Sequence, residues 1–310
     1  MADEVEAADD YLRHVEDALR EAATEIDAAA SVPVSDGATK EYLGRALGQA
    51  RNALSRAERD LAAHVGRRIR HDAERSADRY ISNLRLVEAS NAEVVIAVIP
   101  LPLENERIPL ELISRGAFHT DFTNWVTRFN HDERSTIRLP YLMEVPGNLS
   151  PVFEREQFRF LSYAQGAKEP SQAATLYQSG AFVFRHRLYS WQTPPRYTIG
   201  YVSQDLRSTM LFVLRLYEDL HIAPRSLAIQ SALANVSNFR LMTPTGFGGE
   251  FGGFNELEPK EGLVSIVAPE RPLVVPYTRQ QAVVDQIISR TEASVLSHYR
   301  PSAPSREPKG

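Results

Sequence analysis

The sequence predicts an α+β protein: an N-terminal antiparallel coiled-coil helical hairpin followed by a mixed-sheet α+β domain. Residues 3–29 repeat apolar side chains at alternating steps of three and four, which is the heptad spacing of a coiled coil. Residues 40–87 repeat this spacing after a short loop that contains proline and glycine. From residue 93 onwards, strand-like and helix-like segments mix without a regular strand–helix–strand order, which favours a mixed sheet over a doubly wound parallel one.

The first two helices each have a seam of apolar residues. In the first helix the seam is Val5, Ala8, Leu12, Val15, Leu19, Ala22, Ile26 and Ala29. In the second it is Leu43, Leu47, Ala50, Leu54, Ala57, Leu61, Val65 and Ile69. Pro33 and Gly37 separate the helices, and we expect Thr39 to cap the second. A short loop between two seams predicts an antiparallel hairpin.

The charges of the two helices are opposed. Residues 1–30 hold ten acids and two bases, a net charge of −8, whereas residues 40–87 hold eleven bases and six acids, a net charge of +5. An acidic helix is therefore expected beside a basic one. Exposed ion pairs contribute only about 0–1 kcal/mol each, so these charges set orientation more than they add stability.

The second helix is predicted to extend well beyond the first. Its overhang carries an apolar stripe that needs a cover, either from the rest of the chain or from another protein. We expect a partner interface formed by Ile69, Ala73, Tyr80, Ile81 and Leu84.

The predicted boundaries are a coiled-coil hairpin over residues 1–90, an α+β domain over 91–299 and a disordered tail over 300–310. Continuous apolar or alternating runs predict strands. These runs cover residues 93–101, 135–143, 180–191, 196–203, 226–236, 262–268 and 272–277. Pro194 and Pro195 between two of them predict a hairpin. Helical spacing predicts helices over residues 118–130, 153–165, 204–222 and 279–299.

Residues 176–242 resemble the C-terminal region of bacterial proteins that carry a Schlafen/AlbA-type putative DNA-binding domain in front. The order that carries the resemblance is the strand SGAFVFRHRLY, a second strand, the helix LRSTMLFVLRLYEDLHI and the strand SLAIQSALANV. The hairpin stands here where that family has its AlbA-type domain, so DNA binding is not carried over. The resemblance implies an accessory module whose N-terminal partner was exchanged.

The stretch TGFGGEFGGFNE, residues 245–256, is the first candidate binding site. It fits neither G-x-G-x-x-G nor the Walker pattern, because position 251 is phenylalanine and no G-K-[ST] follows. The glycines favour a loop that presents aromatic tips to a partner or a base, or one whose tips fold back on the domain. The candidate residues are Phe247, Glu250, Phe251 and Phe254.

The strand FVFRHRLYSW offers a second candidate. Alternation places Arg185, Arg187 and Tyr189 on one face, where they would grip a phosphate or carboxylate, or else form cross-strand ion pairs on a solvated face. His186 falls among the apolar residues of the opposite face, which favours a hydrogen-bonded histidine near the core over a ligand or base.

Composition limits the function. The absence of cysteine excludes disulfides, thiolate zinc sites and thiol nucleophiles, and fits a cytoplasmic location. No run of eighteen apolar residues exists, so no membrane partner is expected. No cofactor, metal or catalytic motif is recognised. We therefore expect a non-catalytic interaction protein whose hairpin forms a homo-oligomer or docks a protein partner. One alternative is a nucleic-acid-binding regulator that uses the arginines of 67–75, Arg185, Arg187 and the phenylalanine tips of the glycine-rich loop. The other is an enzyme whose site is assembled from dispersed residues.

Overall fold

The computed structural model describes residues 2–31, 33, 35–131, 150–154, 157–163, 169–190, 192–244, 254–278 and 280–302. Within these ranges the side chains of residues 2–14, 16, 38, 62–70 and 150–154 are not described. The chain divides into two units, Met1–Asp72 and Ala73–Gly310. The strand predicted over residues 135–143 lies outside the described residues.

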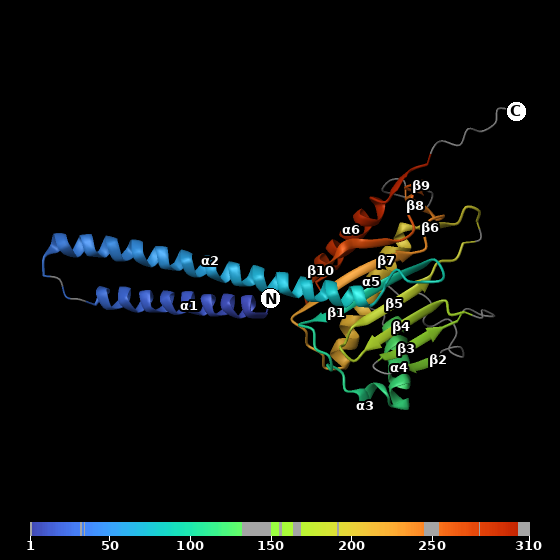
Figure 1. Ribbon diagram of the computed structural model, residues 1–310, viewed down its shortest axis with the longest axis horizontal. Helices are drawn as coiled ribbons and strands as arrows, with labels where there is room; N and C mark the ends of the chain where they lie inside the picture. Colours follow the sequence, from blue (N-terminus) through green and yellow to red (C-terminus); the bar gives the residue numbers. More distant parts are fainter. Residues whose placement is uncertain are drawn as a thin grey trace. The chain divides into compact units, whose positions relative to one another are not determined.

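The two predicted N-terminal helices are present as α1 (Ala2–Ala30) and α2 (Gly37–Asn83), drawn in blue and cyan in Figure 1. The cap of α2 differs from the prediction. Asp36, not Thr39, is the capping residue, because its Oδ2 accepts hydrogen bonds from the Thr39 backbone N–H at 2.9 Å and from the Thr39 hydroxyl at 2.7 Å.

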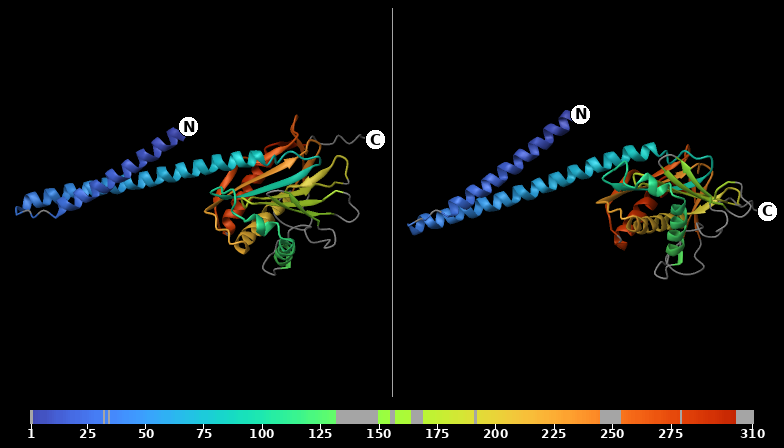
Figure 2. Two further views of the ribbon diagram at one scale, coloured as in Figure 1. Left: turned by 60° about the horizontal axis from the view of Figure 1, so that its bottom comes forward. Right: turned by 90° about the horizontal axis from the view of Figure 1, so that it is seen from below.

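The apolar seam of the first unit is its least exposed surface. Among the side chains described over residues 15–61, none is buried, and those that are half-buried lie on or beside the predicted seams. They are Val15, Leu19, Ala22, Ala23, Ile26, Ala29, Leu43, Leu47, Ala50, Leu54 and Leu61. The two helices approach each other near the turn, where Arg51 Nη2 lies 2.8 Å from Asp27 Oδ1, and they separate toward the start of α1 (Figure 2).

A seven-stranded antiparallel sheet forms the centre of the second unit, in the order β10-β7-β1-β5-β4-β3-β2 (Figure 1). Its strands are β1 (Glu93–Leu101), β2 (Ser150–Glu154), β3 (Gln157–Ser162), β4 (Gln172–Tyr177), β5 (Phe182–Arg187), β7 (Ser226–Ala234) and β10 (Ile266–Pro276). The continuous apolar run of β1 places it near the middle, between β5 and β7.

Helices cover both faces of this sheet. They are α3 (Leu110–Ile113), α4 (Gly116–His131), α5 (Ile199–Asp219) and α6 (Gln281–Leu296), in addition to the end of α2. Alternate residues of β1 separate the two cores: Val94 and Ile96 pack with α4, α5 and α6, whereas Val95 and Ala97 pack with the last turns of α2. The first core contains a group of phenylalanines around Phe212, whose ring centroid lies 5.7 Å from those of Phe122, Phe129 and Phe182.

A second sheet of four strands has the order β11-β9-β8-β6. Its strands are β6 (Arg196–Thr198), β8 (Arg240–Pro244), β9 (Phe254–Pro259) and β11 (Tyr299–Pro301). One face of this sheet joins the core that contains α5 and α6 through Tyr197, Leu241 and Tyr299. The hydroxyls of Tyr197 and Tyr299 lie 3.0 Å apart. Burial raises the pKa of Tyr299 to about 12 and raises that of Tyr197 well above its usual value.

Two predictions of local structure are wrong. The predicted helix over residues 153–165 does not form, because β2 ends at Glu154 and residues 157–162 form β3. In β3 the side chains of Phe158 and Phe160 are buried, whereas those of Gln157 and Arg159 are half-buried. The predicted hairpin over residues 180–203 does not form either. β5 pairs with β1 and β4, whereas β6 is only three residues long and pairs in parallel with β8, and Ile199 already begins α5.

The boundaries also differ from those predicted. Residues 73–83 of α2 belong to the second unit, because Ala77 and Ile81 are buried in the core on that face of the sheet. At the C-terminus, Arg300 and Pro301 pair with β9 and therefore belong to a strand rather than to a disordered tail. Residues 303–310 lie outside the described residues. Within the part of the chain that the structure describes, no helix is both long and apolar enough to cross a membrane.

Candidate functional site

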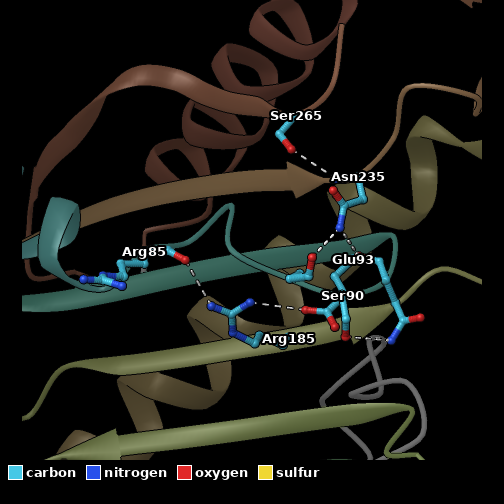
Figure 3. Close-up of polar contacts among 8 residues, drawn as sticks. Arg85, Ser90, Glu93, Arg185, Asn235 and Ser265 are labelled. Carbon is cyan, nitrogen blue, oxygen red and sulfur yellow. Dashed lines mark hydrogen bonds and ion pairs between the residues drawn. The ribbon is translucent and has the colours of Figure 1, made fainter.

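The predicted arginine face of β5 exists, and both guanidinium groups have partners within the chain. Arg185 Nη1 lies 3.2 Å from Glu93 Oε2, and its Nη2 lies 3.5 Å from the carbonyl oxygen of Arg85 (Figure 3). Arg187 forms an ion pair with Glu169. These contacts correspond to the ion-pair alternative of the sequence analysis. They also remove two of the cations on which a nucleic-acid site would have relied.

Arg187 has two further partners that complete its environment. Its Nη2 donates to Asn91 Oδ1 at 2.9 Å, and its guanidinium carbon lies 5.2 Å from the centre of the Tyr189 ring. Both arginines are less than a quarter exposed. The side chains of the arginines at 67, 68 and 70 lie outside the described ones.

A polar cluster holds the segment that joins α2 to β1. The side-chain amide of Asn235 donates to the carbonyl oxygens of Ala89 and Asn91, the latter at 3.3 Å (Figure 3). The backbone N–H of Asn235 donates to Ser265 Oγ at 3.1 Å. Asn235 has a φ of 54°, a left-handed conformation that asparagine tolerates better than most residues. This cluster therefore anchors the start of the sheet.

His186 lies on the apolar face of β5, as its place in the strand predicts. Its Nδ1 is 2.8 Å from Oδ2 of Asp205, a carboxyl group of α5 that is almost fully buried. Sequence reasoning missed Asp205, although its position one residue before the buried Leu206 could have marked an acid that needs a partner. The pair links β5 to α5 and satisfies a buried carboxylate.

Four of the five residues predicted as a partner interface on α2 pack against the chain's own sheet. Ile81 is buried, and Ala73, Tyr80 and Leu84 are half-buried against the same core. The Tyr80 hydroxyl also lies 2.6 Å from Ser179 Oγ. The sequence analysis allowed the apolar stripe of α2 to be covered either by the rest of the chain or by another protein. In the structure, the chain's own sheet covers Ala73, Tyr80, Ile81 and Leu84. The assignment of Ile81 to a partner is therefore corrected, and the side chain of Ile69 lies outside the described ones.

A pocket brings together two candidates that are far apart in the sequence, Tyr189 and Phe254. Its volume is about 370 Å³. The residues that line it are Tyr189, Ser190, Gln192, Arg196, Tyr197, Thr198, Tyr201, Met242 and Phe254. Arg185 and Arg187 are not among them. Phe247, Glu250 and Phe251 lie outside the described residues.

Sequence reasoning missed the pocket residues contributed by β6 and β8. The alternation of Arg196, Tyr197 and Thr198 was visible in the sequence, but it was assigned to the wrong sheet. Over the residues that the structure describes, no group of three or more His, Asp or Glu side chains could hold a metal ion. Comparison of the chain with protein-family models, curated proteins and solved structures finds no match.

Proposed function

We propose that the chain is a non-catalytic interaction protein. In this proposal α1 and the first part of α2 form an antiparallel coiled-coil hairpin that mediates self-association or docks a protein partner, and the α+β unit carries the hairpin. The observation that carries the proposal is the half-buried seam of the first unit.

The seam is incompletely buried in the first unit, and this incomplete burial is the reason for proposing a partner. Isolated helices owe most of their stability in proteins to packing of their apolar face rather than to helix propensity. Between residues 15 and 61, the side chains that are described include leucines and alanines on the seams, but none of them is buried. A second hairpin or a partner helix packed on the seam would complete the burial and stabilise both helices.

The charges support an ordered arrangement of helices. Residues 1–30 have a net charge of −8, and residues 40–87 have a net charge of +5. The pair of Asp27 and Arg51 is more than half exposed at both side chains, so it adds little stability. Such pairs nevertheless favour an acidic helix beside a basic one, both within a hairpin and between two hairpins.

The test uses the full chain and two variants at neighbouring positions. Leu47 is half-buried on the seam, whereas Ala46 is exposed, so Leu47→Lys and Ala46→Lys add the same charge to different faces of α2. Size-exclusion chromatography with light scattering should give the wild type and Ala46→Lys a multiple of 34.8 kDa. Leu47→Lys should shift the mass toward 34.8 kDa itself.

A different experiment tests whether the seam binds another protein instead of a second copy of this chain. If the wild type is monomeric, cross-linking in cell extract should capture one protein with the wild type and with Ala46→Lys, and should lose it with Leu47→Lys. A monomeric wild type that captures nothing in this seam-dependent manner would contradict the proposal.

A further inference from the structure

Part of the pocket lining comes from the outer face of the four-stranded sheet. The inner face of this sheet is marked by the buried residues Tyr197, Leu241 and Tyr299. Thr198 is opposite Met242 in the β6–β8 register, and side chains alternate along each strand. Thr198 and Met242 therefore share the outer face, where they form part of the pocket lining.

The pocket gathers aromatic side chains that the fold leaves exposed. Tyr189 is 49% exposed, Tyr201 is 60% exposed and Phe254 is 54% exposed. Among the described residues, only seven large apolar side chains are exposed, and these three line one pocket. Single exposed apolar residues need no explanation, but their convergence on one concave surface indicates a binding site.

Arg196 gives the pocket its polarity. Its Nη2 lies 3.2 Å from Glu256 Oε2, but its buried Nε has no hydrogen-bond partner among the described residues. A buried donor without a partner is unfavourable, and an acceptor on a ligand would satisfy it. Within the described part of the chain, Arg196 is the one charged residue in the pocket lining, and Glu256, with which it pairs, lies outside that lining.

Size and chemistry together define the class of ligand. A volume of about 370 Å³ is at the small end of the range of small-molecule sites, which begins at roughly 300 Å³. Exposed tyrosine and phenylalanine rings stack on planar rings, and an arginine binds carboxylates and phosphates through charge-assisted hydrogen bonds. We propose that this pocket binds a small planar aromatic ring that carries an anionic group, as a nucleotide or an aromatic carboxylate does.

The first test compares whole ligands with their halves. The probes are adenosine 5′-monophosphate and 4-hydroxybenzoate, titrated into the full chain by isothermal titration calorimetry, with adenosine and inorganic phosphate as the separate ring and anion. At least one of the two whole ligands should bind with a Kd below about 1 mM. If the nucleotide binds, adenosine and phosphate should each bind about ten-fold more weakly or worse. The ligand that binds identifies the source of the ring and anion.

The second test places the binding site. Tyr201→Ala and Phe254→Ala change side chains that are more than half exposed, so the fold should be retained, and each should weaken binding about ten-fold. Arg196→Gln should remove the preference for the charged ligand, while Arg196→Lys should keep part of it. The matched control is Tyr42→Ala, which removes a tyrosine that is 75% exposed and lies on α2, outside the pocket lining.

Three outcomes would overturn the inference. Neither whole ligand binds, or adenosine binds as well as its monophosphate, or Tyr201→Ala and Phe254→Ala leave the affinity unchanged. The inference does not depend on the hairpin. Leu47→Lys should therefore bind the ligand with the affinity of the wild type, so this test and the test of self-association fail or succeed separately.

Discussion

The first unit and the sheet unit use equally regular apolar patterns and bury them to different extents. In β1, residues 94–100 are all buried, because helices cover one face of the sheet and the end of α2 covers the other. In α1 and the first part of α2, the apolar seam is only half-buried. The spacing of apolar residues therefore determines which face of an element is apolar. The number of layers packed on that face determines how much of it is removed from water.

This difference assigns different roles to the two units. Stability of the α+β unit comes from its two cores, where large side chains are fully buried. The described apolar side chains on the seams of the first unit are at most half-buried, and the proposed association would cover them.

The largest effect is expected for the phenylalanine cluster. Phe212→Ala removes a buried ring that contacts three other phenylalanines, and should lower the free energy of unfolding by about 3–5 kcal/mol. Leu47→Ala changes a half-buried seam residue, and the same measurement by urea denaturation should show a clearly smaller loss for the α+β unit. Equal losses would contradict the contrast between a core and a seam.

Substitution of two glycines by alanine should change stability in opposite directions. Gly180 has a φ of +82°, and an added Cβ would lie 3.0 Å from Pro100 Cγ, so Gly180→Ala should destabilise the chain by about 1–2 kcal/mol or more. Gly48 lies within α2 with nothing within 4 Å of an added Cβ, so Gly48→Ala should stabilise the helix by about 1 kcal/mol. Thermal unfolding followed by circular dichroism measures both. A loss of helix stability in Gly48→Ala would show that something packs against that position.

The smallest effect is a dependence on pH. Because burial raises the pKa of Tyr299 from 10.0 to about 12, the folded chain keeps the phenolic proton to a higher pH than the unfolded chain does. The contribution of Tyr299 to stability is therefore complete below about pH 10 and is lost as the pH rises toward 12. The slope is at most about 1.4 kcal/mol per pH unit for one proton.

Urea denaturation at a series of alkaline pH values isolates this contribution. Tyr299→Phe should make the loss of stability with pH less steep. The control is Tyr42→Phe, which removes a phenol that is 75% exposed on α2 and should leave the slope close to that of the wild type. If the two variants have the same slope, the buried tyrosine is not its source.

Elements with strong local patterns could be predicted from the sequence. The two long helices, β1, β7, α4, α5 and α6 all appear where apolar spacing indicated them. The prediction of a helix over residues 153–165 was wrong. The spacing of charges and phenylalanines in this segment fits a helix, but pairing of β3 with β2 and β4 makes it extended. Pairing of one segment with its neighbours is an interaction between segments, which the spacing of apolar residues within a single segment does not encode.

The residues of the pocket could likewise be predicted only in part from the sequence. Tyr189 and Phe254 were both candidate binding residues in the sequence, but on separate segments with no indication that they meet. Their proximity depends on the parallel pairing of β6 with β8 and the antiparallel pairing of β8 with β9. Arg196 and Met242 therefore became candidates only when the second sheet was known.

The anchoring of the chain before β1 has a mechanical consequence. Asn235 ties the segment between α2 and β1 to the end of β7, and Arg185 reaches back to Arg85 in the same segment. β1 is hydrogen-bonded to a strand on each side, with the bonds perpendicular to its axis. Tension applied along β1 would therefore have to shear two ladders together instead of opening one hydrogen bond after another.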